Sequence, residues 1–137
     1  MNKSTQIKSD LCPCGSAKPS SDCCQPYIQR ICEPPTAEAL MRSRYTAFVV
    51  LDENYLRYSW HPDTCPKNIH LNENCQWLGL KIKNTLAGGE RDETGEVEFV
   101  ARNKIYGKAS RLHENSRFSR FTGRWVYVDG KMDNKID

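Results

Sequence analysis

Hydrophobic and polar residues alternate in the second half of the chain, which predicts β-strands because successive side chains of a strand point to opposite faces of a sheet. In residues 76–86, Leu78, Leu80 and Ile82 alternate with Trp77 and with lysines. This pattern is typical of a strand with one buried face. We expect the three aliphatic side chains on that face and Trp77 on the other.

Three further segments continue the pattern. Residues 95–107 alternate in the same way, and Gly88-Gly89 marks the turn before them. Residues 108–121 and 124–128 are the third and fourth predicted strands, with a Thr-Gly turn between them. Strands that follow one another through short turns predict an antiparallel meander.

The first half has the three-and-four spacing of helices. Thr36 follows two prolines, which cannot lie inside a helix, and its hydroxyl can cap the helix that begins there. Asp52 is the expected cap of a second, short helix that ends before Pro62. One stripe of the first helix is formed by Leu40, Arg44, Ala47 and Leu51. Helices followed by a meander predict an α+β fold, with the helices covering one face of the sheet.

Composition changes this picture little. The 137 residues are 38% hydrophobic and 27% charged, enough to bury a core without a metal or a disulfide. No segment approaches the roughly 20 apolar residues that span a bilayer. Residues 1–10 are polar, are expected to be flexible and lack the apolar centre of a secretory signal. We therefore expect a cytoplasmic protein with no membrane partner.

Four of the seven cysteines lie close together, as the pairs Cys12/Cys14 and Cys23/Cys24. Four thiolates are the ligand set of a closed, structural zinc site, and Lys18 could offset part of their negative charge. Two disulfides are the alternative, but a reducing cytosol disfavours them and adjacent cysteines bridge each other poorly. We predict one structural Zn²⁺ bound by these four residues.

The segment "CPCGSAK" followed by "CC" resembles the SEC-C motif, a small zinc-binding segment known from the tail of the SecA translocation motor. In that motif the loop between the cysteine pairs is rich in lysine and holds an aromatic residue. Here the loop is "AKPSSD", without the aromatic and with little positive charge. The resemblance therefore implies metal binding, and it implies less about a partner surface like that of the motor.

The rest of the chain resembles the YchJ-like family of bacterial proteins. The similar segments are "LMRSRYTAF", "YSWHP", "WLGL", "VEFVAR", "ENSRF" and "WVYVDG". The resemblance implies a SEC-C segment, residues 1–32, followed by a nuclear-transport-factor-like cone, residues 33–137. In such a cone the helices pack into the concave face of a bent antiparallel sheet. The family has no established reaction, so the resemblance implies none for this chain.

Cones of this type often enclose a pocket. Glu114 shares a strand face with Leu112, Ser116 and Phe118, so it could serve there as a general base. The alternative is a buried structural ion pair between Glu114 and Arg44. Arg42 and Arg44 are about 200° apart on a helix, so only one of them can face the pocket. The expected pocket residues are Arg44, Tyr45, Trp60, Glu114 and Phe118.

Other candidates carry weaker signals. His61 and Cys65 could form a metal pair or an activated thiol, but no third group is evident. The arginines between Arg111 and Arg124 resemble a nucleic-acid surface in composition, although the alternation of a strand splits them between two faces. Cys32 and Cys75 are expected to be small buried residues, and His113 to be exposed.

Together these observations predict a zinc-binding protein of the α+β class. Its SEC-C segment would be structural or contact a protein partner, and its cone would hold a small-molecule ligand. One alternative is an enzyme with Glu114 as general base, and another is an accessory protein of RNA or the ribosome. The sequence leaves the choice between monomer and homodimer open.

Overall fold

The computed structural model describes residues 11–132, so residues 1–10 and their expected flexibility lie outside the described part. A 3-10 turn, η1 (Ser20–Asp22), and a short helix, α2 (Gln25–Ile28), follow the first cysteine pair. The two longer helices are α3 (Ala37–Val49) and α4 (Glu53–Tyr58). The strands are β1 (Cys75–Ala87), β2 (Thr94–Ile105), β3 (Lys108–Phe121) and β4 (Arg124–Met132).

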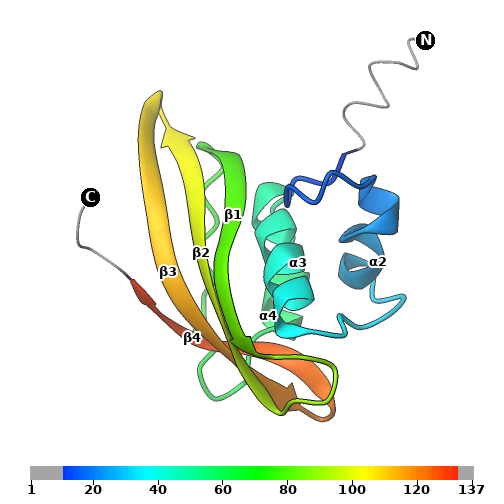
Figure 1. The fold of residues 1–137 in the computed structure, drawn as a ribbon. Coiled ribbons are helices and arrows are strands. Elements are labelled where there is room, and N and C mark those ends of the chain that lie inside the picture. Colours follow the sequence, from blue (N-terminus) through cyan, green and yellow to red (C-terminus); the bar gives the residue numbers. More distant parts are fainter. Residues whose placement is uncertain (1–10, 133–137) are drawn as a thin grey trace.

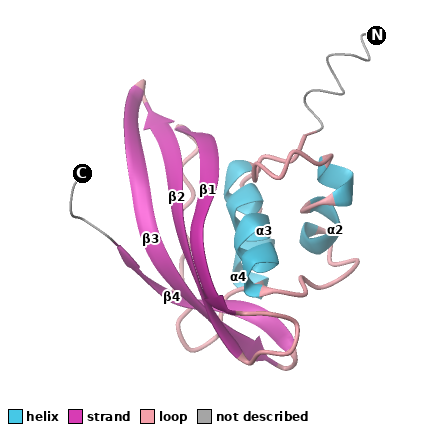
Figure 2. Cartoon of the chain, viewed as in Figure 1, coloured by secondary structure: helices cyan, strands magenta, loops and turns pink. Residues whose placement is uncertain are grey.

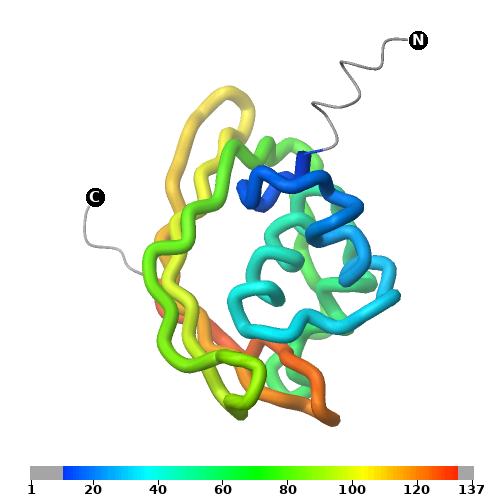
Figure 3. Tube along the Cα trace, turned by 45° about the vertical axis from the view of Figure 1, so that its right-hand side comes forward, coloured from blue at the N-terminus to red at the C-terminus, as the bar shows by residue number. Residues whose placement is uncertain are grey.

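The four strands form one antiparallel sheet in the order β1-β2-β3-β4. The sheet bends, and helix α3 lies against its concave side (Figures 1 and 2). The turned view shows the strands curving around the helical layer, with α2 on the far side of α3 from the sheet (Figure 3). The α+β class predicted from the pattern and the cone that the family resemblance implies are both confirmed.

Both predicted helix caps form. The hydroxyl oxygen of Thr36 accepts from the backbone N–H of Ala39 at 3.0 Å, and a carboxylate oxygen of Asp52 accepts from Tyr55 N–H at 3.0 Å. Helix α3 begins against the β1–β2 turn, where the N–H of Ala37 donates to the carbonyl of Gly88 at 2.9 Å. A Cβ on Gly88 would lie only 2.8 Å from that of Ala37, so this approach requires a glycine.

The predicted faces of β1 are wrong at its beginning. Trp77 packs against the core together with Leu80 and Ile82, whereas Leu78 is 40% exposed. The cause is a shift in the β1–β2 pairing between Trp77 and Gly79. An irregularity of this kind adds a residue to one strand and reverses the alternation on either side of it.

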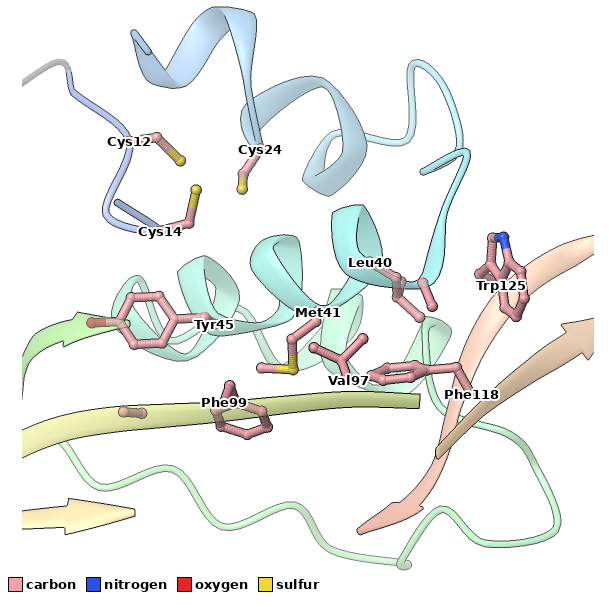
Figure 4. Packing of buried hydrophobic residues seen from close by; sticks show 12 residues of the cluster. Cys12, Cys14, Cys24, Leu40, Met41, Tyr45, Val97, Phe99, Phe118 and Trp125 are labelled. Carbon is pink, nitrogen blue, oxygen red and sulfur yellow. The ribbon is translucent and has the colours of Figure 1, made fainter. Parts of the chain in front are cut away.

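Helix α3 is the centre of the molecule, since eight of its thirteen residues are buried. Met41 and Tyr45 pack with Val97 and Phe99 of the sheet, as Figure 4 shows. On a second side, the hydroxyl of Ser43 lies 2.7 Å from that of a tyrosine of α4. On a third side the helix faces the cysteine segment, whose buried cysteines belong to the same hydrophobic cluster. A single helix therefore contacts the sheet, α4 and the cysteine segment.

None of the helices within residues 11–132 is long and apolar enough to cross a membrane.

Candidate functional site

The loop that carries the first cysteine pair folds back on itself. The N–H of Cys12 donates to the carbonyl of Lys18 at 2.9 Å, and the N–H of Gly15 donates to the carbonyl of Cys12 at 3.2 Å. Gly15 has φ +84°, which is the left-handed conformation that favours glycine. Cys23 ends η1, and Cys24 is the N-cap of α2. These turns bring two pairs separated by eight residues to one place.

The four sulfur atoms of Cys12, Cys14, Cys23 and Cys24 all lie within 4.8 Å of one another. Sγ of Cys14 is 3.6 Å from that of Cys23, which is 3.9 Å from that of Cys24. Four Zn–S bonds of about 2.3 Å in a tetrahedron place the sulfurs about 3.8 Å apart, so the spacing fits such a metal. Figure 4 shows the sulfurs of Cys12, Cys14 and Cys24 turned toward one another. Every cysteine in the described chain is a free thiol.

The thiols influence one another strongly. Hydrogen bonds with the thiols of Cys14 and Cys24 lower the pKa of Cys12. The hydrogen bond with Cys12 raises the pKa of Cys24, and burial raises the pKa of Cys23. Without a cation, ionisation of one thiol therefore opposes ionisation of its neighbours. A bound dication would remove this conflict, because it stabilises all four thiolates at once.

Two side chains of α3 contact the cysteine cluster. Arg42 donates through Nη1 to the carbonyl of Cys14 at 2.9 Å and approaches its Sγ at 3.8 Å. Its Nε donates to the carboxylate of Glu38 at 3.0 Å. One turn further, the hydroxyl of Thr46 lies 3.6 Å from Sγ of Cys12. The positive charge beside the cysteines is thus Arg42, a residue that no sequence pattern connects with them, whereas Lys18, the expected charge, is exposed.

On the other side of α3, a cavity of about 240 Å³ lies between the helix and the sheet. Arg44, Tyr45, Trp60 and Glu114 line it, four of the five residues expected at a pocket. Phe118, the fifth, is 1% exposed and is part of the core, outside the lining of this cavity. Arg44 faces the cavity, whereas Arg42 faces the cysteines. The two arginines therefore point to different sides of α3, as their spacing along a helix predicts.

Arg44 is 4% exposed and is held by neutral groups. Its Nη1 donates to the hydroxyl of Ser59 at 2.7 Å and to the carbonyl of Leu56 at 2.9 Å. Its guanidinium carbon lies 4.8 Å from the ring centre of Trp60 and 4.7 Å from that of Tyr127. Burial lowers the pKa of Arg44 to about 10, so the side chain is still charged at neutral pH.

Glu114 is held by two hydroxyl groups. One carboxylate oxygen, Oε2, accepts from Ser116 at 2.9 Å and from Tyr127 at 3.1 Å. Burial and the neighbouring carboxylate raise the pKa of Tyr127, so it is a neutral donor at pH 7. A Cβ on Gly130 of the adjacent strand would overlap the carboxylate, so the glycine leaves the space that Glu114 occupies.

The direct ion pair expected between Glu114 and Arg44 does not form. Within residues 11–132, no carboxylate oxygen lies within 4.0 Å of the Arg44 guanidinium. Tyr127 separates the two groups, since its hydroxyl binds Glu114 while its ring lies beside Arg44. Ser116 and Tyr127 were not predicted as pocket residues. The same-face spacing of Ser116 and Glu114 was visible, but the cross-strand position of Tyr127 depends on a register shift between β3 and β4.

The side chains of His61 and Cys65 point to different partners. Nδ1 of His61 accepts from the backbone N–H of Asp63 at 3.0 Å. The sulfur of Cys65 lies 3.8 Å from a guanidinium nitrogen of Arg57. In the described part of the chain, the cysteine cluster is the one group of three or more histidine, cysteine, aspartate or glutamate residues close enough together to hold a metal. Neither a metal role nor an activated thiol at His61 and Cys65 gains support from this geometry.

The arginines of the basic run are mostly engaged within the protein. Arg117 forms a two-pronged ion pair with Asp129, with both contacts at 2.7 Å. Arg120 donates to backbone carbonyls of the β1–β2 turn and stacks on the ring of Trp125 at 4.3 Å. Arg124 donates to a carbonyl at 3.1 Å. These contacts divide the run between several places, and binding of nucleic acid stays a prediction.

The remaining predictions concern isolated residues. Cys32 is exposed, so the prediction of a buried position is wrong, because it lies in the loop between α2 and α3. Cys75 is half-buried at the start of β1. His113 is also half-buried, and its Nε2 lies 2.7 Å from a carboxylate oxygen of Glu98, so the expectation of an exposed side chain is wrong.

Comparisons with known proteins agree with this architecture. Residues 36–130 match the family model of the YchJ middle NTF2-like domain, and residues 9–26 match the SEC-C motif. A UPF0225 protein of Chromobacterium violaceum is 49% identical over 132 residues, covering 93% of this chain and 97% of that protein. A UPF0225 protein of Deinococcus radiodurans is 44% identical over 119 residues, covering 86% of each.

Two solved structures share the fold. The solution structure of a SEC-C motif containing protein from Rhodopseudomonas palustris has a TM-score of 0.79 and 32% identity, covering 90% of this chain and 98% of that one. The crystal structure of a SEC-C motif containing protein from Psychrobacter arcticus has a TM-score of 0.72 and 24% identity, covering 93% and 85%. On the strength of the matched domain, the motif and these relatives, the chain belongs to the YchJ-like family of UPF0225 proteins.

Proposed function

We propose that this protein is a cytoplasmic zinc-binding protein that uses one structural Zn²⁺ to fix the helix forming a wall of its ligand cavity. The observation that carries the proposal is the placement of four sulfur atoms within 4.8 Å of one another. Cys12, Cys14, Cys23 and Cys24 would hold the metal, and four protein ligands leave no coordination position open. The metal would therefore supply stability and charge balance, with the chemistry of the protein located elsewhere.

The link between metal and cavity is helix α3. One side of this helix presents Arg42 and Thr46 to the cysteines, and another presents Arg44 and Tyr45 to the cavity. Metal binding is coupled to folding wherever the ligands come together only in the folded state. A metal that fixes the cysteine segment against α3 would thus also fix the position of Arg44.

Native mass spectrometry with and without a strong chelator tests the metal. We expect one zinc ion per chain, removed by the chelator, and no zinc in Cys23→Ser. Cys32→Ser is the matched control, because Cys32 is an exposed cysteine outside the cluster and its loss should leave the zinc content unchanged. An unchanged zinc content in Cys23→Ser would contradict the four-ligand site.

A second candidate function is catalysis with Glu114 as general base. It is favoured by the position of the carboxylate in the cavity, where Oε2 accepts two hydrogen bonds and Oε1 accepts none from the described chain. A base must reach a proton of its substrate through such a free oxygen. In this case Glu114→Gln would abolish turnover while leaving the fold intact, and a variant with unchanged turnover would exclude the role.

A further inference from the structure

The cavity beside α3 contains a buried positive charge, Arg44, that no carboxylate of residues 11–132 contacts directly. Arg44 donates through Nη1 to a carbonyl and a hydroxyl, whereas its Nε and Nη2 donate to no group in residues 11–132. A guanidinium carries five N–H donors in a planar fork that matches a carboxylate. Burying an ion without an opposite charge is costly, so a site that retains one gains from an anionic ligand.

A second donor at the cavity is also without an acceptor. The indole N–H of Trp60 is buried and has no hydrogen-bond partner in the described chain. The ring of Trp60 lies against the Arg44 guanidinium, so the two unpaired donors are neighbours. Buried polar groups in folded proteins nearly always have a partner. Two neighbouring donors without acceptors indicate a ligand group rich in acceptors.

Glu114 provides a negatively charged hydrogen-bond acceptor in the same cavity. Its Oε2 is occupied by Ser116 and Tyr127, and its Oε1 is free to accept from a ligand. Because Tyr127 separates the carboxylate from Arg44, the two charges do not neutralise each other by direct contact. A ligand that reaches both would need an anionic group at one end and a hydrogen-bond donor at the other.

Aromatic side chains form the wall between these polar groups. The rings of Tyr45 and Trp77 meet edge to face with centres 5.6 Å apart, and Phe48 lies 6.2 Å from Trp77. Such walls accept a flat apolar body. The volume of about 240 Å³ is below the roughly 300–1,000 Å³ typical of pockets for drug-sized ligands, so a nucleotide or a peptide would not fit.

We propose that the cavity binds a small aromatic carboxylate that also carries a hydroxyl or amino group. Its carboxylate would bind Arg44 and the indole N–H of Trp60, and its donor would bind Oε1 of Glu114. This inference rests on the proposed role of the cavity in ligand binding.

A matched series of benzene derivatives tests the ligand class. 4-Hydroxybenzoate has both polar groups, benzoate lacks the donor, 4-hydroxybenzamide lacks the charge, phenol lacks the carboxylate, and benzylamine carries the opposite charge. Binding is followed by NMR of the indole N–H signals. Trp60 and Trp77 line the cavity, while Trp125 is an internal control because it lies outside the lining, with its N–H bonded to the carbonyl of Pro35 at 3.1 Å.

We expect 4-hydroxybenzoate to move the Trp60 and Trp77 signals with a Kd below about 1 mM, leaving that of Trp125 in place. Each of the other compounds should bind at least about tenfold more weakly, since it lacks either the negative charge or one of the two polar contacts. Arg44→Lys should also weaken 4-hydroxybenzoate about tenfold, because an ammonium lacks the planar fork. Arg117→Lys, on an exposed arginine outside this cavity, is the control and should have no effect.

Two results would overturn the inference in different ways. If phenol or benzylamine bound as tightly as 4-hydroxybenzoate, the ligand class would be wrong, although the cavity would still be a ligand site. If no compound moved the Trp60 and Trp77 signals, the role of the cavity in the proposed function would fail as well. Should Arg44→Lys not fold, the compound series on the unaltered protein decides the question alone, and the zinc measurement is unaffected by either outcome.

Discussion

The two sides of helix α3 show two different ways of building a site. The cysteine cluster comes from thirteen consecutive positions, 12–24, and its four ligands satisfy the usual coordination number of zinc by themselves. The cavity is lined by residues from α3, from all four strands and from the segment after α4, and it leaves donors of Arg44 and Trp60 unpaired. A site whose own residues satisfy the whole coordination of a metal is typical of a structural element. A site that leaves hydrogen-bond donors unpaired is typical of ligand binding.

Removing the metal is the strongest test of this distinction. In zinc-finger peptides a structural zinc supplies about 10–16 kcal/mol of folding free energy. This protein has a larger core that does not consist of the metal site alone, so we expect chelation to lower the free energy of unfolding by at least about 3 kcal/mol. Urea unfolding with and without chelator, followed by circular dichroism, measures this change.

The control for that experiment is Cys14→Ser, whose sulfur is fully buried in the cluster. This variant should already have the lower stability, and chelator should change it no further. If chelation left the stability of the unaltered protein within about 0.5 kcal/mol, the range of a neutral surface change, the cysteine cluster would not be a structural metal site.

The sequence predicted the cysteine cluster better than the cavity because the cluster depends on local geometry. The spacing of Cys12, Cys14, Cys23 and Cys24 and one glycine turn were enough to place the four thiols together. Helix α3, its Thr36 cap and the order of the strands are also consequences of local patterns. The cavity depends instead on which residues of distant strands meet.

Trp77 shows why this second kind of contact was harder to predict. Strict alternation assigns it to the outer face, and a single irregularity between Trp77 and Gly79 turns it into the cavity wall. Tyr127 reaches Glu114 after a similar shift between β3 and β4. Such irregularities leave no clear mark in the sequence, because one extra residue on a strand changes the pairing without changing the pattern of residue types.

Arg42 allows the boundary between the two sites to be tested. Its guanidinium contacts the carbonyl and the sulfur of Cys14, so it would stabilise the negative charge of a zinc–thiolate centre. We expect Arg42→Gln to weaken zinc binding about 10- to 100-fold, the range found for groups that support metal ligands. Competition with a chromophoric chelator measures the affinity.

Glu38→Gln is the matched control for Arg42. It removes the ion pair at 3.0 Å without removing the contact between Arg42 and Cys14. If this variant weakened zinc binding as much as Arg42→Gln, the effect would arise from the stability of α3 and not from the contact with the sulfur.

A substitution at Gly130 tests how much the position of Glu114 in the cavity contributes to stability. A Cβ at this position would overlap the carboxylate of Glu114, so Gly130→Ala should displace it from Ser116 and Tyr127. Loss of these two hydrogen bonds should cost about 1–3 kcal/mol of unfolding free energy and leave zinc binding unchanged. Gly79→Ala is the control, because a Cβ there meets nothing within 4 Å. Equal stability of the two variants would show that the carboxylate moves aside without loss.

Glu114→Gln separates a charge held for ligand binding from a charge held for stability. The amide oxygen of glutamine can accept from Ser116 and Tyr127 as the carboxylate does, so the variant loses only the extra strength of charge-assisted hydrogen bonds, about 1 kcal/mol. A buried ion pair between Glu114 and Arg44 would give a much larger loss, about 3–5 kcal/mol, because the arginine would be left without its partner. Since Tyr127 lies between the two charges, we expect the smaller value in thermal or urea unfolding, accompanied by weaker binding of 4-hydroxybenzoate.

Glu98→Gln, which alters a half-buried carboxylate outside the lining of the cavity, should leave that binding unchanged. A loss of stability in the larger range would mean that Arg44 and Glu114 support each other electrostatically and that the cavity, like the cysteine cluster, is already complete without a ligand.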